Sequence, residues 1–335
     1  MALFLSTDDV RELATADLVM DAARSAVNAE REGRAVIPPR LDVNLPRGFL
    51  RVMPGALDGL MGLKVMTLVR GVGNRYLLLV YTQETGELLA MLDADEVTRL
   101  RTAGITAVAA HVLQPEPQRR IALIGSGFEA TTHLRAMARL WPLESVAVYS
   151  PSVERRTAFA ERQTLELGID VKPVCSAAKA IGTARTVVLA TKASEPVIDG
   201  RDLQPDSVVL SIGSTRPDLR ELDRSTLRRA AVVMVDDAAS VLRECGDLID
   251  AIAHGAVTPD HLVSIAGVMS APETLERSGE RDLRVFKSAG TAVQDLALAG
   301  RLLTAATTRG VGRELGELTR LKPATAPVQL EGEVA

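Results

Sequence analysis

The pattern of apolar and polar positions divides the chain near residue 115. Before that point, an amphipathic run over residues 6–32 predicts a helix that starts at the Ser6-Thr7-Asp8-Asp9 cap and ends at Gly33. Short apolar runs predict strands over residues 49–53, 62–69, 76–82 and 88–92. A turn at residues 84–87 makes the last two a hairpin, and Asp93 is the expected cap of a helix over residues 93–113.

After the break at Pro115-Glu116-Pro117, apolar strands alternate with helical segments. The predicted strands cover residues 120–125, 145–150, 186–190, 207–212 and 231–235. The predicted helices cover residues 130–140, 152–167 and 291–307, the last after a stretch of small residues that begins near 285. Strands and helices that alternate at this spacing indicate an α/β fold with a parallel, doubly wound sheet.

The composition agrees with such a core and argues against several classes of protein. The 335 residues suggest two domains at about 150 residues each. With only five Phe, three Tyr and one Trp, the core must be built from Ala, Val, Leu and Ile, as in helices packed on a parallel sheet. Few aromatic residues and a net charge of −4 argue against binding to nucleic acid or to an anionic membrane.

Cysteine, histidine and the N-terminal residues indicate a cytoplasmic protein without a metal site. Cys175 and Cys245 cannot form a disulfide framework, and the four histidines are scattered along the chain. The N-terminus lacks the basic and apolar regions of a signal peptide. No apolar stretch approaches the ~20 residues of a membrane span, so the cytoplasm is the expected location.

A glycine loop follows the first strand of the second half. Residues Gly125-Ser126-Gly127-Phe128-Glu129-Ala130 fit the pattern G-x-G-x-x-G/A at a strand-to-helix turn. Gly125 permits the tight turn, Gly127 lets the backbone approach a pyrophosphate, and Ala130 lets the helix pack closely on the strand. The helix N-terminus would present free N–H groups to the anion. The loop predicts a dinucleotide site, although a ligand-free tight connection has the same pattern.

The end of the second strand bears on the choice between NADH and NADPH. It reads Tyr149-Ser150-Pro151-Ser152, without the acidic residue that would bind the ribose 2′-hydroxyl of NADH. Arg155 and Arg156 follow closely and could bind a 2′-phosphate, which slightly favours NADPH. The alternative is that these arginines are ordinary surface charges on a helix.

Several segments in the same order resemble the ornithine cyclodeaminase/μ-crystallin family, from about residue 36 to residue 307. They are Pro38-Pro39-Arg40, Val52-Met53-Pro54-Gly55, Gly62-Leu63-Lys64-Val65, residues 85–90, Leu100-Arg101-Thr102-Ala103, the glycine loop and residues 286–295. The resemblance implies a Rossmann domain over residues 117–290 and a discontinuous α+β substrate and dimerisation domain. This second domain would comprise residues 1–116 and a C-terminal helix over 291–320. Residues 321–335 are an expected mobile tail.

The resemblance also implies the site residues and a nicotinamide cofactor. In the family, the residues that match Arg40, Lys64 and Arg101 contact the substrate. Arginines suit a carboxylate, and a lysine among apolar neighbours has a lowered pKa that suits proton transfer. For each, a surface charge or a structural ion pair is the alternative. The predicted cofactor site consists of Gly125, Ser126, Gly127, Phe128, Glu129, Ala130, Ser150, Ser152, Arg155, Thr191, Gly213, Ser214 and Gly290.

One departure from the cyclodeaminase pattern helps to choose the reaction. Cyclodeaminases and related alanine dehydrogenases carry Gly-Ala-Asp after the strand at 207–212, whereas this chain has Gly213-Ser214-Thr215-Arg216-Pro217. A threonine hydroxyl cannot act as a carboxylate base at neutral pH, and the sequence resembles the μ-crystallin branch, which is similar to ketimine reductases. A second departure is Gly104, where alanine is usual.

These features leave three hypotheses. The first is an NAD(P)H-dependent reductase of a carboxylate-bearing imine, with Arg40 and Arg101 holding the carboxylate and with Lys64, or water held by Lys64 and Thr215, supplying a proton. The second is an ornithine or lysine cyclodeaminase or an amino-acid dehydrogenase. The third is a non-catalytic protein that binds a small ligand. A homodimer and a small imino, oxo or amino acid are the expected partners, and Lys287, His133 and Cys245 have no assigned role.

Overall fold

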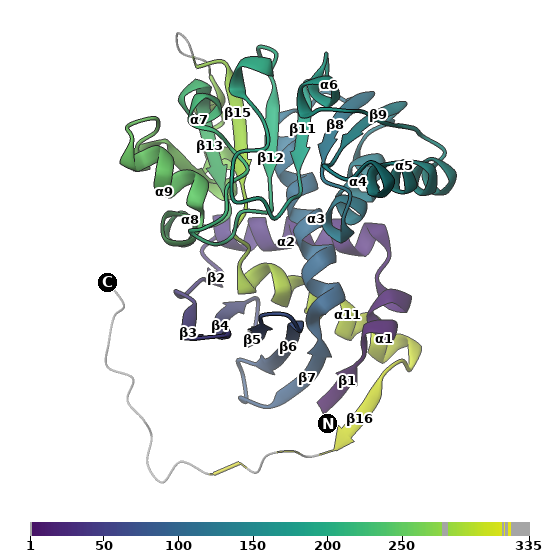
Figure 1. Cartoon of the computed structure of the whole chain (residues 1–335). Coiled ribbons are helices and arrows are strands. Elements are labelled where there is room, and N and C mark those ends of the chain that lie inside the picture. The colour runs from purple at the N-terminus through teal and green to yellow at the C-terminus, as the bar shows by residue number, and fades with distance from the viewer. Residues whose placement is uncertain (1, 277–280, 317, 319–320, 323–335) are drawn as a thin grey trace.

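The computed structural model describes residues 2–276, 281–316, 318 and 321–322, and it shows two lobes, each built on an eight-stranded sheet (Figure 1). We call them the mixed-sheet lobe and the parallel-sheet lobe. The mixed sheet has the order β16-β1-β7-β6-β5-β4-β2, with β3 paired to β4. Its strands are β1 (Ala2–Leu5), β2 (Ala35–Val36), β3 (Leu41–Leu45), β4 (Gly48–Leu57), β5 (Leu60–Val69), β6 (Gly73–Thr82), β7 (Leu88–Asp93) and β16 (Arg313–Gly316).

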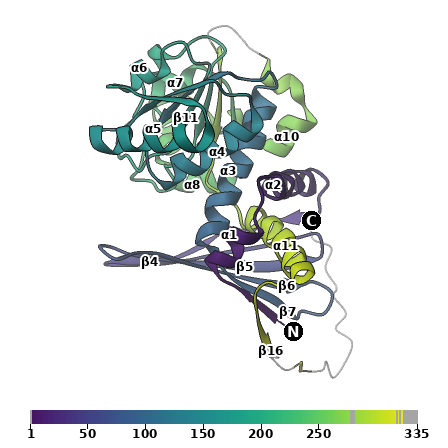
Figure 2. The same ribbon diagram turned by 90° about the vertical axis from the view of Figure 1, so that its right-hand side faces the viewer.

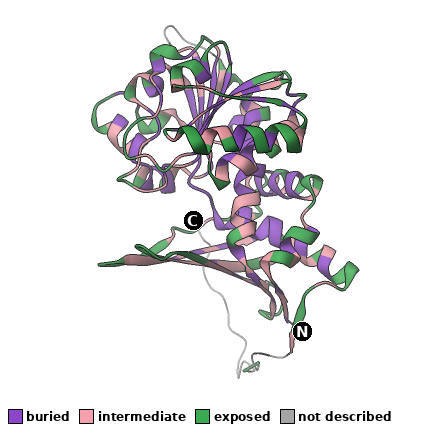
Figure 3. Ribbon diagram, turned by 45° about the vertical axis from the view of Figure 1, so that its right-hand side comes forward, coloured by how far each residue is buried: buried purple, intermediate pink, exposed green. Residues whose placement is uncertain are grey.

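One face of the mixed sheet is covered by helices and the other is open (Figure 2). One of these helices is α11 (Ala292–Arg309), and Leu78, Val80 and Leu92 on this face are completely buried. Side chains alternate between the faces of a strand, so their neighbours Leu77 and Leu79 lie on the opposite face and are only half-buried. Figure 3 shows the same difference, with many intermediate residues in this sheet.

The first two helices correct one prediction. The structure divides the expected helix over residues 6–32 into α1 (Thr7–Leu13) and α2 (Ala16–Arg31). Ser6 caps α1 as predicted, but Thr15 begins a new helix because its hydroxyl accepts a hydrogen bond from the backbone of Leu18. Helix α3 (Ala94–Leu113) begins at its predicted cap Asp93 and runs from the mixed-sheet lobe into the second lobe (Figure 1).

The second sheet is parallel throughout, with the order β10-β9-β8-β11-β12-β15-β13-β14. Its strands are β8 (Arg120–Ile124), β9 (Ser145–Tyr149), β10 (Asp170–Pro173), β11 (Thr186–Leu189), β12 (Val208–Ser211), β13 (Ala230–Val235), β14 (Leu262–Ser264) and β15 (Leu283–Lys287). The order reverses beside β8, as in a Rossmann fold, and this confirms the predicted doubly wound sheet. A stretch of small residues was expected to begin near residue 285. The structure instead has strand β15 there, and this strand lies between β12 and β13.

Helices surround the parallel sheet (Figure 1). They are α4 (Phe128–Leu140), α5 (Val153–Leu167), α6 (Ala177–Ile181), α7 (Arg224–Arg229), α8 (Ala238–Glu244), α9 (Gly246–Ala253), α10 (Ile265–Ser270) and the short 3₁₀ turns at Gly200–Asp202, Pro259–His261 and Pro272–Leu275. Within the described residues, no helix has both the length and the apolar character that crossing a membrane requires.

The C-terminal segment differs from the expected helix over residues 291–320. Helix α11 ends at Arg309 because Gly310 adopts a left-handed conformation (φ +66°), and the chain then forms strand β16. Most of the expected mobile tail, residues 323–335, lies outside the described residues. The domain boundaries inferred from the resemblance remain a prediction.

Candidate active site

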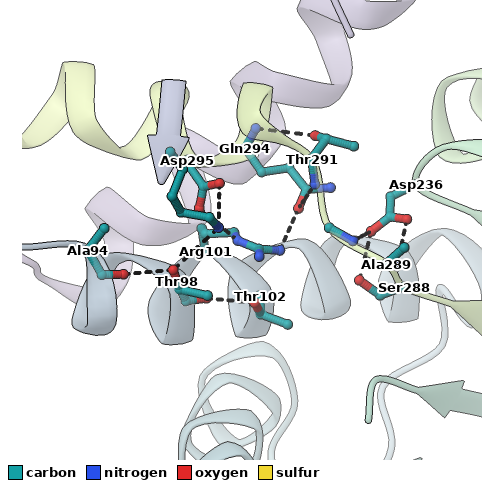
Figure 4. A network of polar contacts seen from close by, with 12 residues as sticks. Ala94, Thr98, Arg101, Thr102, Asp236, Ser288, Ala289, Thr291, Gln294 and Asp295 are labelled. Carbon is teal, nitrogen blue, oxygen red and sulfur yellow. Dashed lines mark hydrogen bonds and ion pairs between the residues drawn. The ribbon is translucent and has the colours of Figure 1, made fainter. Parts of the chain in front are cut away.

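Three elements bring charged side chains to one buried carboxylate. The Nζ atom of Lys64 in β5 lies 2.7 Å from Oδ2 of Asp295 in α11. The Nε atom of Arg101 in α3 donates to Oδ1 of Asp295 at 3.0 Å, and its Nη1 donates to Gln294 at 3.0 Å (Figure 4). Asp295 is fully buried, so the structure joins the predicted residues Lys64 and Arg101 through a carboxylate to which the sequence assigned no role.

The environment of Lys64 suits proton transfer. Burial lowers its pKa from the usual 10.5 to about 8, although the charge of Asp295 opposes this shift. Its ammonium group also lies 3.4 Å from the hydroxyl of Thr98. A lysine with this pKa is protonated at neutral pH and can release its proton readily.

Arg40 approaches the same region from the extended segment after Pro38-Pro39. Its Nη2 donates to the carbonyl of Gly290 at 2.7 Å, and its Nε lies 2.8 Å from Glu244. Burial lowers the pKa of Arg40, and burial raises the pKa of Glu244. Glu244 also pairs with Arg51, whose guanidinium binds Asp42 through two hydrogen bonds of 2.7 and 2.6 Å. Arg40 is therefore held by charge pairs on one side and by the chain at Gly290 on the other.

Gly290 lies between the two predicted arginines. Its φ of +76° favours glycine, and a Cβ atom there would overlap the guanidinium of Arg101. Its carbonyl accepts from Arg40. The structure thus places Gly290 against the candidate substrate arginines, while its assignment to the cofactor remains a prediction.

Asp236 holds the loop that carries Gly290. Its carboxylate accepts hydrogen bonds from the Ser288 hydroxyl at 2.7 Å, from the Ala289 backbone at 2.9 Å and from the Gly290 backbone at 2.7 Å (Figure 4). Asp236 was not among the site residues predicted from the sequence. The available signal was its position directly after the buried strand β13, at the carboxyl edge of a parallel sheet.

The glycine loop has the predicted backbone geometry. Gly125 has a φ of +122°, and a Cβ atom there would overlap the carbonyl of Ala190. Gly127 caps α4, and no atom lies within 4 Å of where its Cβ would be, which leaves the backbone accessible to a ligand. Ala130 is fully buried against the strand. Phe128 points outward and is 80% exposed, with the guanidinium of Arg99 5.7 Å from its ring.

The end of β9 holds its predicted residues in different ways. The hydroxyls of Ser126 and Ser150 are 2.8 Å apart, which joins the glycine loop to this strand. Ser152 caps α5 by accepting from the backbone of Arg155 at 3.1 Å. Arg156 donates to the Ser150 carbonyl at 2.8 Å and stacks on Tyr149, whereas the exposed side chain of Arg155 makes no hydrogen bond or ion pair with other described residues.

Glu221 draws two strand-end loops together. Its Oε1 accepts from the backbone and hydroxyl of Thr191 at 2.6 and 2.8 Å, and its Oε2 accepts from the Gly213 backbone at 2.8 Å. Behind it, Lys287 lies 3.1 Å from Asp247 and 2.9 Å from the Ser211 hydroxyl. Burial acts to lower the pKa of Lys287, but the acidic groups around it raise the value overall. Lys287 is thus a fixed counter-ion beneath the loops of Thr191 and Gly213.

Two predicted residues of the loop after β12 do not join the charged cluster. The Ser214 hydroxyl donates to the carbonyl of Leu219 at 2.7 Å, so it is used within its own loop. Thr215 is half-buried and makes no hydrogen bond to Lys64 within the described part of the chain. Its proposed role in holding water remains a prediction.

His133 and Cys245 have structural surroundings. His133 of α4 is fully buried, and burial lowers its pKa to about 4, so its imidazole is neutral. One ring nitrogen lies 3.2 Å from the Thr106 hydroxyl of α3. Burial raises the pKa of Cys245 to about 12, which keeps it a thiol. Among residues 2–276 and 281–316, no group of three or more histidine, cysteine, aspartate or glutamate side chains is arranged to hold a metal ion.

The model of the "Ornithine cyclodeaminase/mu-crystallin family" matches residues 1–307. A Delta(1)-pyrroline-2-carboxylate reductase of Bacillus cereus is 28% identical over 323 residues, which cover 93% of this chain and 99% of that protein. The ketimine reductase mu-crystallin of Rattus norvegicus is 30% identical over 312 residues, covering 88% of this chain and 95% of that protein.

Solved structures are similar over the same length. The Thermococcus litoralis Delta(1)-pyrroline-2-carboxylate reductase, in complex with NADH and L-proline, has a TM-score of 0.86 and 28% identity, covering 93% of this chain and 100% of that one. An archaeal alanine dehydrogenase dimer with bound NAD has a TM-score of 0.86 and 26% identity, covering 93% of this chain and 98% of that one. Both share the arrangement of the two lobes described above.

Proposed function

The chain belongs to the ornithine cyclodeaminase/mu-crystallin family, and we propose that it is an NAD(P)H-dependent reductase. Its substrate is a ketimine or cyclic imino acid that carries a carboxylate next to the C=N bond, and its product is the corresponding amino acid. The observation that carries this proposal is the buried ammonium of Lys64. It pairs with Asp295, as Arg101 does, and it lies close to the segment at Gly290 that binds Arg40.

The residues divide the work of the reaction between binding and proton transfer. Arg40 and Arg101 bind the substrate carboxylate; the Nη2 of Arg101 makes no hydrogen bond within the described residues and has donors to spare. Lys64 gives its proton to the imine nitrogen as the carbon accepts a hydride, so that one C–H and one N–H bond replace the C=N π bond. The resulting neutral lysine is tolerated because burial already lowers its pKa.

The glycine loop fits a dinucleotide. The free backbone at Gly127 and the N-terminus of α4 suit a pyrophosphate, and Ser150, Thr191 and Gly213 lie at the strand ends around it. A nicotinamide bound there supplies the hydride. Glu221 positions the Thr191 and Gly213 loops for this group.

The test is an assay with a cyclic imino acid such as Δ1-pyrroline-2-carboxylate. We expect the absorbance of the reduced nicotinamide to fall steadily as the amino acid forms. Ornithine converted to proline and ammonia without net change in the cofactor would favour the cyclodeaminase instead. Nucleotide binding without turnover of any imino, oxo or amino acid would favour a binding protein.

We propose that NADPH is the preferred cofactor, with Arg155 next to the 2′-phosphate. The support is the lack of an acidic residue at the end of β9 and the side chain of Arg155, which pairs with no other described residue, whereas Arg156 is already bound to Ser150. Replacing Arg155 by alanine should raise KM for NADPH and leave KM for NADH unchanged. Equal effects on the two cofactors would contradict this preference.

We also propose a homodimer through the open face of the mixed sheet. Val52, Val65 and Leu77 are in register on this face and only half-buried, and they form a continuous apolar surface with Leu63 and Leu79. The archaeal alanine dehydrogenase above is a dimer. Light scattering should give a molar mass of twice that of the chain. The Val65→Lys variant should give the molar mass of a single chain. The control Leu165→Lys, at an 89% exposed apolar residue of α5, should leave the dimer intact.

We propose that the two lobes have different roles. Residues 1–116 with 291–320 would hold the substrate and the dimer contact, and residues 117–290 would hold the nucleotide. The support is that α11 carries Asp295 back to the mixed sheet, whereas the glycine loop begins at the first strand of the parallel sheet.

A further inference from the structure

A cavity lies apart from the charged cluster at Asp295. It has a volume of about 500 Å³, within the range of about 300–1,000 Å³ that small-molecule sites occupy. Its walls come from the α1–α2 connection, α2 and α3 on one side and from α4 and α5 on the other. In Figure 2, α3 lies between α4 and α2 at the junction of the two lobes, and residues of all three helices line the cavity.

The inner wall of this cavity is apolar. It is formed by Val19 and Met20 of α2 and by Leu100, Ala103 and Gly104 of α3. A Cβ atom on Gly104 would lie 3.0 Å from Cγ1 of Val19, so glycine lets α2 and α3 approach closely beside the cavity. No functional residue of the proposed reaction lines this wall.

The rim of the cavity is rich in arginine. Arg99, Arg135, Arg139 and Arg162 line it, against the single carboxylate of Glu96. Asp17 and Glu166 pair with Arg139 and Arg135 at 2.6 and 2.5 Å, but they do not line the cavity. The side chains of Asp17 and Glu166 are 73% and 36% exposed, and such exposed ion pairs contribute little free energy.

Two of these arginines have unused donors. The guanidinium of Arg162 stacks on Phe159 and has no acidic partner within ion-pair distance among the described residues. The Nε of Arg99 is buried and makes no hydrogen bond with the described residues, although it lies 3.7 Å from Asp95 and the guanidinium pairs with Glu96. The exposed ring of Phe128 lies at the same rim, 5.7 Å from Arg99. Arg162 therefore brings to the rim a positive charge that no described acidic group pairs with, and an anion in the cavity would supply that partner.

From this arrangement, we propose that the cavity is a second binding site, for a small amphipathic carboxylate. The apolar body of the ligand packs on Val19, Met20 and Leu100, and its carboxylate meets the arginines of the rim. Arginine binds a carboxylate through paired hydrogen bonds, and an apolar pocket with a few charged groups is typical of such sites. This site is separate from the arginines that we assign to the imino acid.

Calorimetric titration with octanoate tests the proposal, because octanoate has the apolar chain and the carboxylate. We expect saturable binding of one octanoate per chain. 1-Octanol, which lacks the charge, and acetate, which lacks the chain, should each bind at least about tenfold more weakly, as expected for the loss of a charged hydrogen bond or of the apolar contact. Equal affinity for 1-octanol and octanoate would overturn the role of the arginines.

Variants locate the site. The double substitution Arg135→Glu with Arg162→Glu should weaken octanoate binding at least about tenfold. The control Arg119→Glu removes an exposed arginine that pairs with Glu144 in the same lobe but lies outside the cavity, and it should leave the affinity unchanged. Ala136→Leu keeps every charge and fills the cavity, so it should also weaken binding.

Competition separates this site from the proposed active site. Octanoate should bind equally well when NADPH and L-proline are saturating. Displacement by these two compounds, full binding to the double variant, or no detectable binding to the wild-type chain would each overturn the proposal. None of these measurements requires turnover, so their failure is distinguishable from failure of the proposed reductase activity.

Discussion

Two buried lysines of this protein have opposite electrostatic surroundings. Lys64 contacts the carboxylate of Asp295 and also experiences the positive charges of Arg101 and Arg40, and burial lowers its pKa to about 8. Burial also acts on Lys287, but this lysine lies between Asp247 and Glu221, and its pKa is raised overall. The balance of neighbouring charges therefore decides whether a buried lysine can transfer a proton or serves as a fixed counter-ion.

Removing Lys64 should have the largest effect of the changes that test this comparison. We expect Lys64→Met to reduce kcat by about 10²–10⁴-fold, the usual contribution of a proton donor. The affinity for nucleotide should stay the same, because the glycine loop belongs to the other lobe. Steady-state kinetics and a nucleotide titration check this, and a variant with normal kcat would show that Lys64 is not the donor.

Removing Lys287 should instead act on stability. Lys287→Met leaves Asp247 and Glu221 buried without their counter-ion, which should lower the free energy of unfolding by about 3–5 kcal/mol. Urea denaturation measures this loss. The control Lys179→Met, at an exposed lysine of α6, should change it by less than about 0.5 kcal/mol. If Lys287→Met is as stable as the control, the counter-ion role is wrong.

The pH profile of the wild-type enzyme should report on Lys64 and not on Lys287. Lys64 must be protonated to give its proton, and its pKa is lowered to about 8. As pH rises through this value the protonated fraction falls, so kcat should decline about tenfold per pH unit above it. A kcat that stays constant well above pH 8 would contradict the assignment.

Asp295→Asn should shift that profile. The carboxylate of Asp295 raises the pKa of Lys64 against the effect of burial, so its loss lowers this pKa further. The alkaline limb of kcat should therefore move to lower pH by about one unit or more. If Asp295 only supports the fold, the variant would lose activity without any shift of the limb, and the pH profile distinguishes the two outcomes.

Local patterns in the sequence were sufficient for much of the fold. The alternation of strands and helices after residue 117 predicted the doubly wound sheet, and the glycine spacing predicted the turn at Gly125, where φ is +122°. These features depend on neighbouring residues, so they can be recognised without the tertiary structure. The position of β15 between β12 and β13 could not, because strand order depends on pairing between distant segments.

The candidate site shows the same limit. The resemblance pointed to Arg40, Lys64 and Arg101, but nothing in the sequence paired Lys64 and Arg101 with Asp295, about two hundred residues away along the chain. Asp236, Glu221 and Glu244 were missed for the same reason, since each acts on residues from another strand or loop.

The two lysines show most clearly what each level determines. In the sequence, Lys64 stands in the apolar run Gly-Leu-Lys-Val, which predicted a strand and a lysine among apolar neighbours. Lys287 follows Val-Phe in a stretch for which no strand was predicted, so the sequence pointed to burial of Lys64 but assigned no environment to Lys287. Only the tertiary structure placed one carboxylate and two arginines around Lys64 and two carboxylates around Lys287, and charge interactions in a buried site depend on distances that the chain order does not contain.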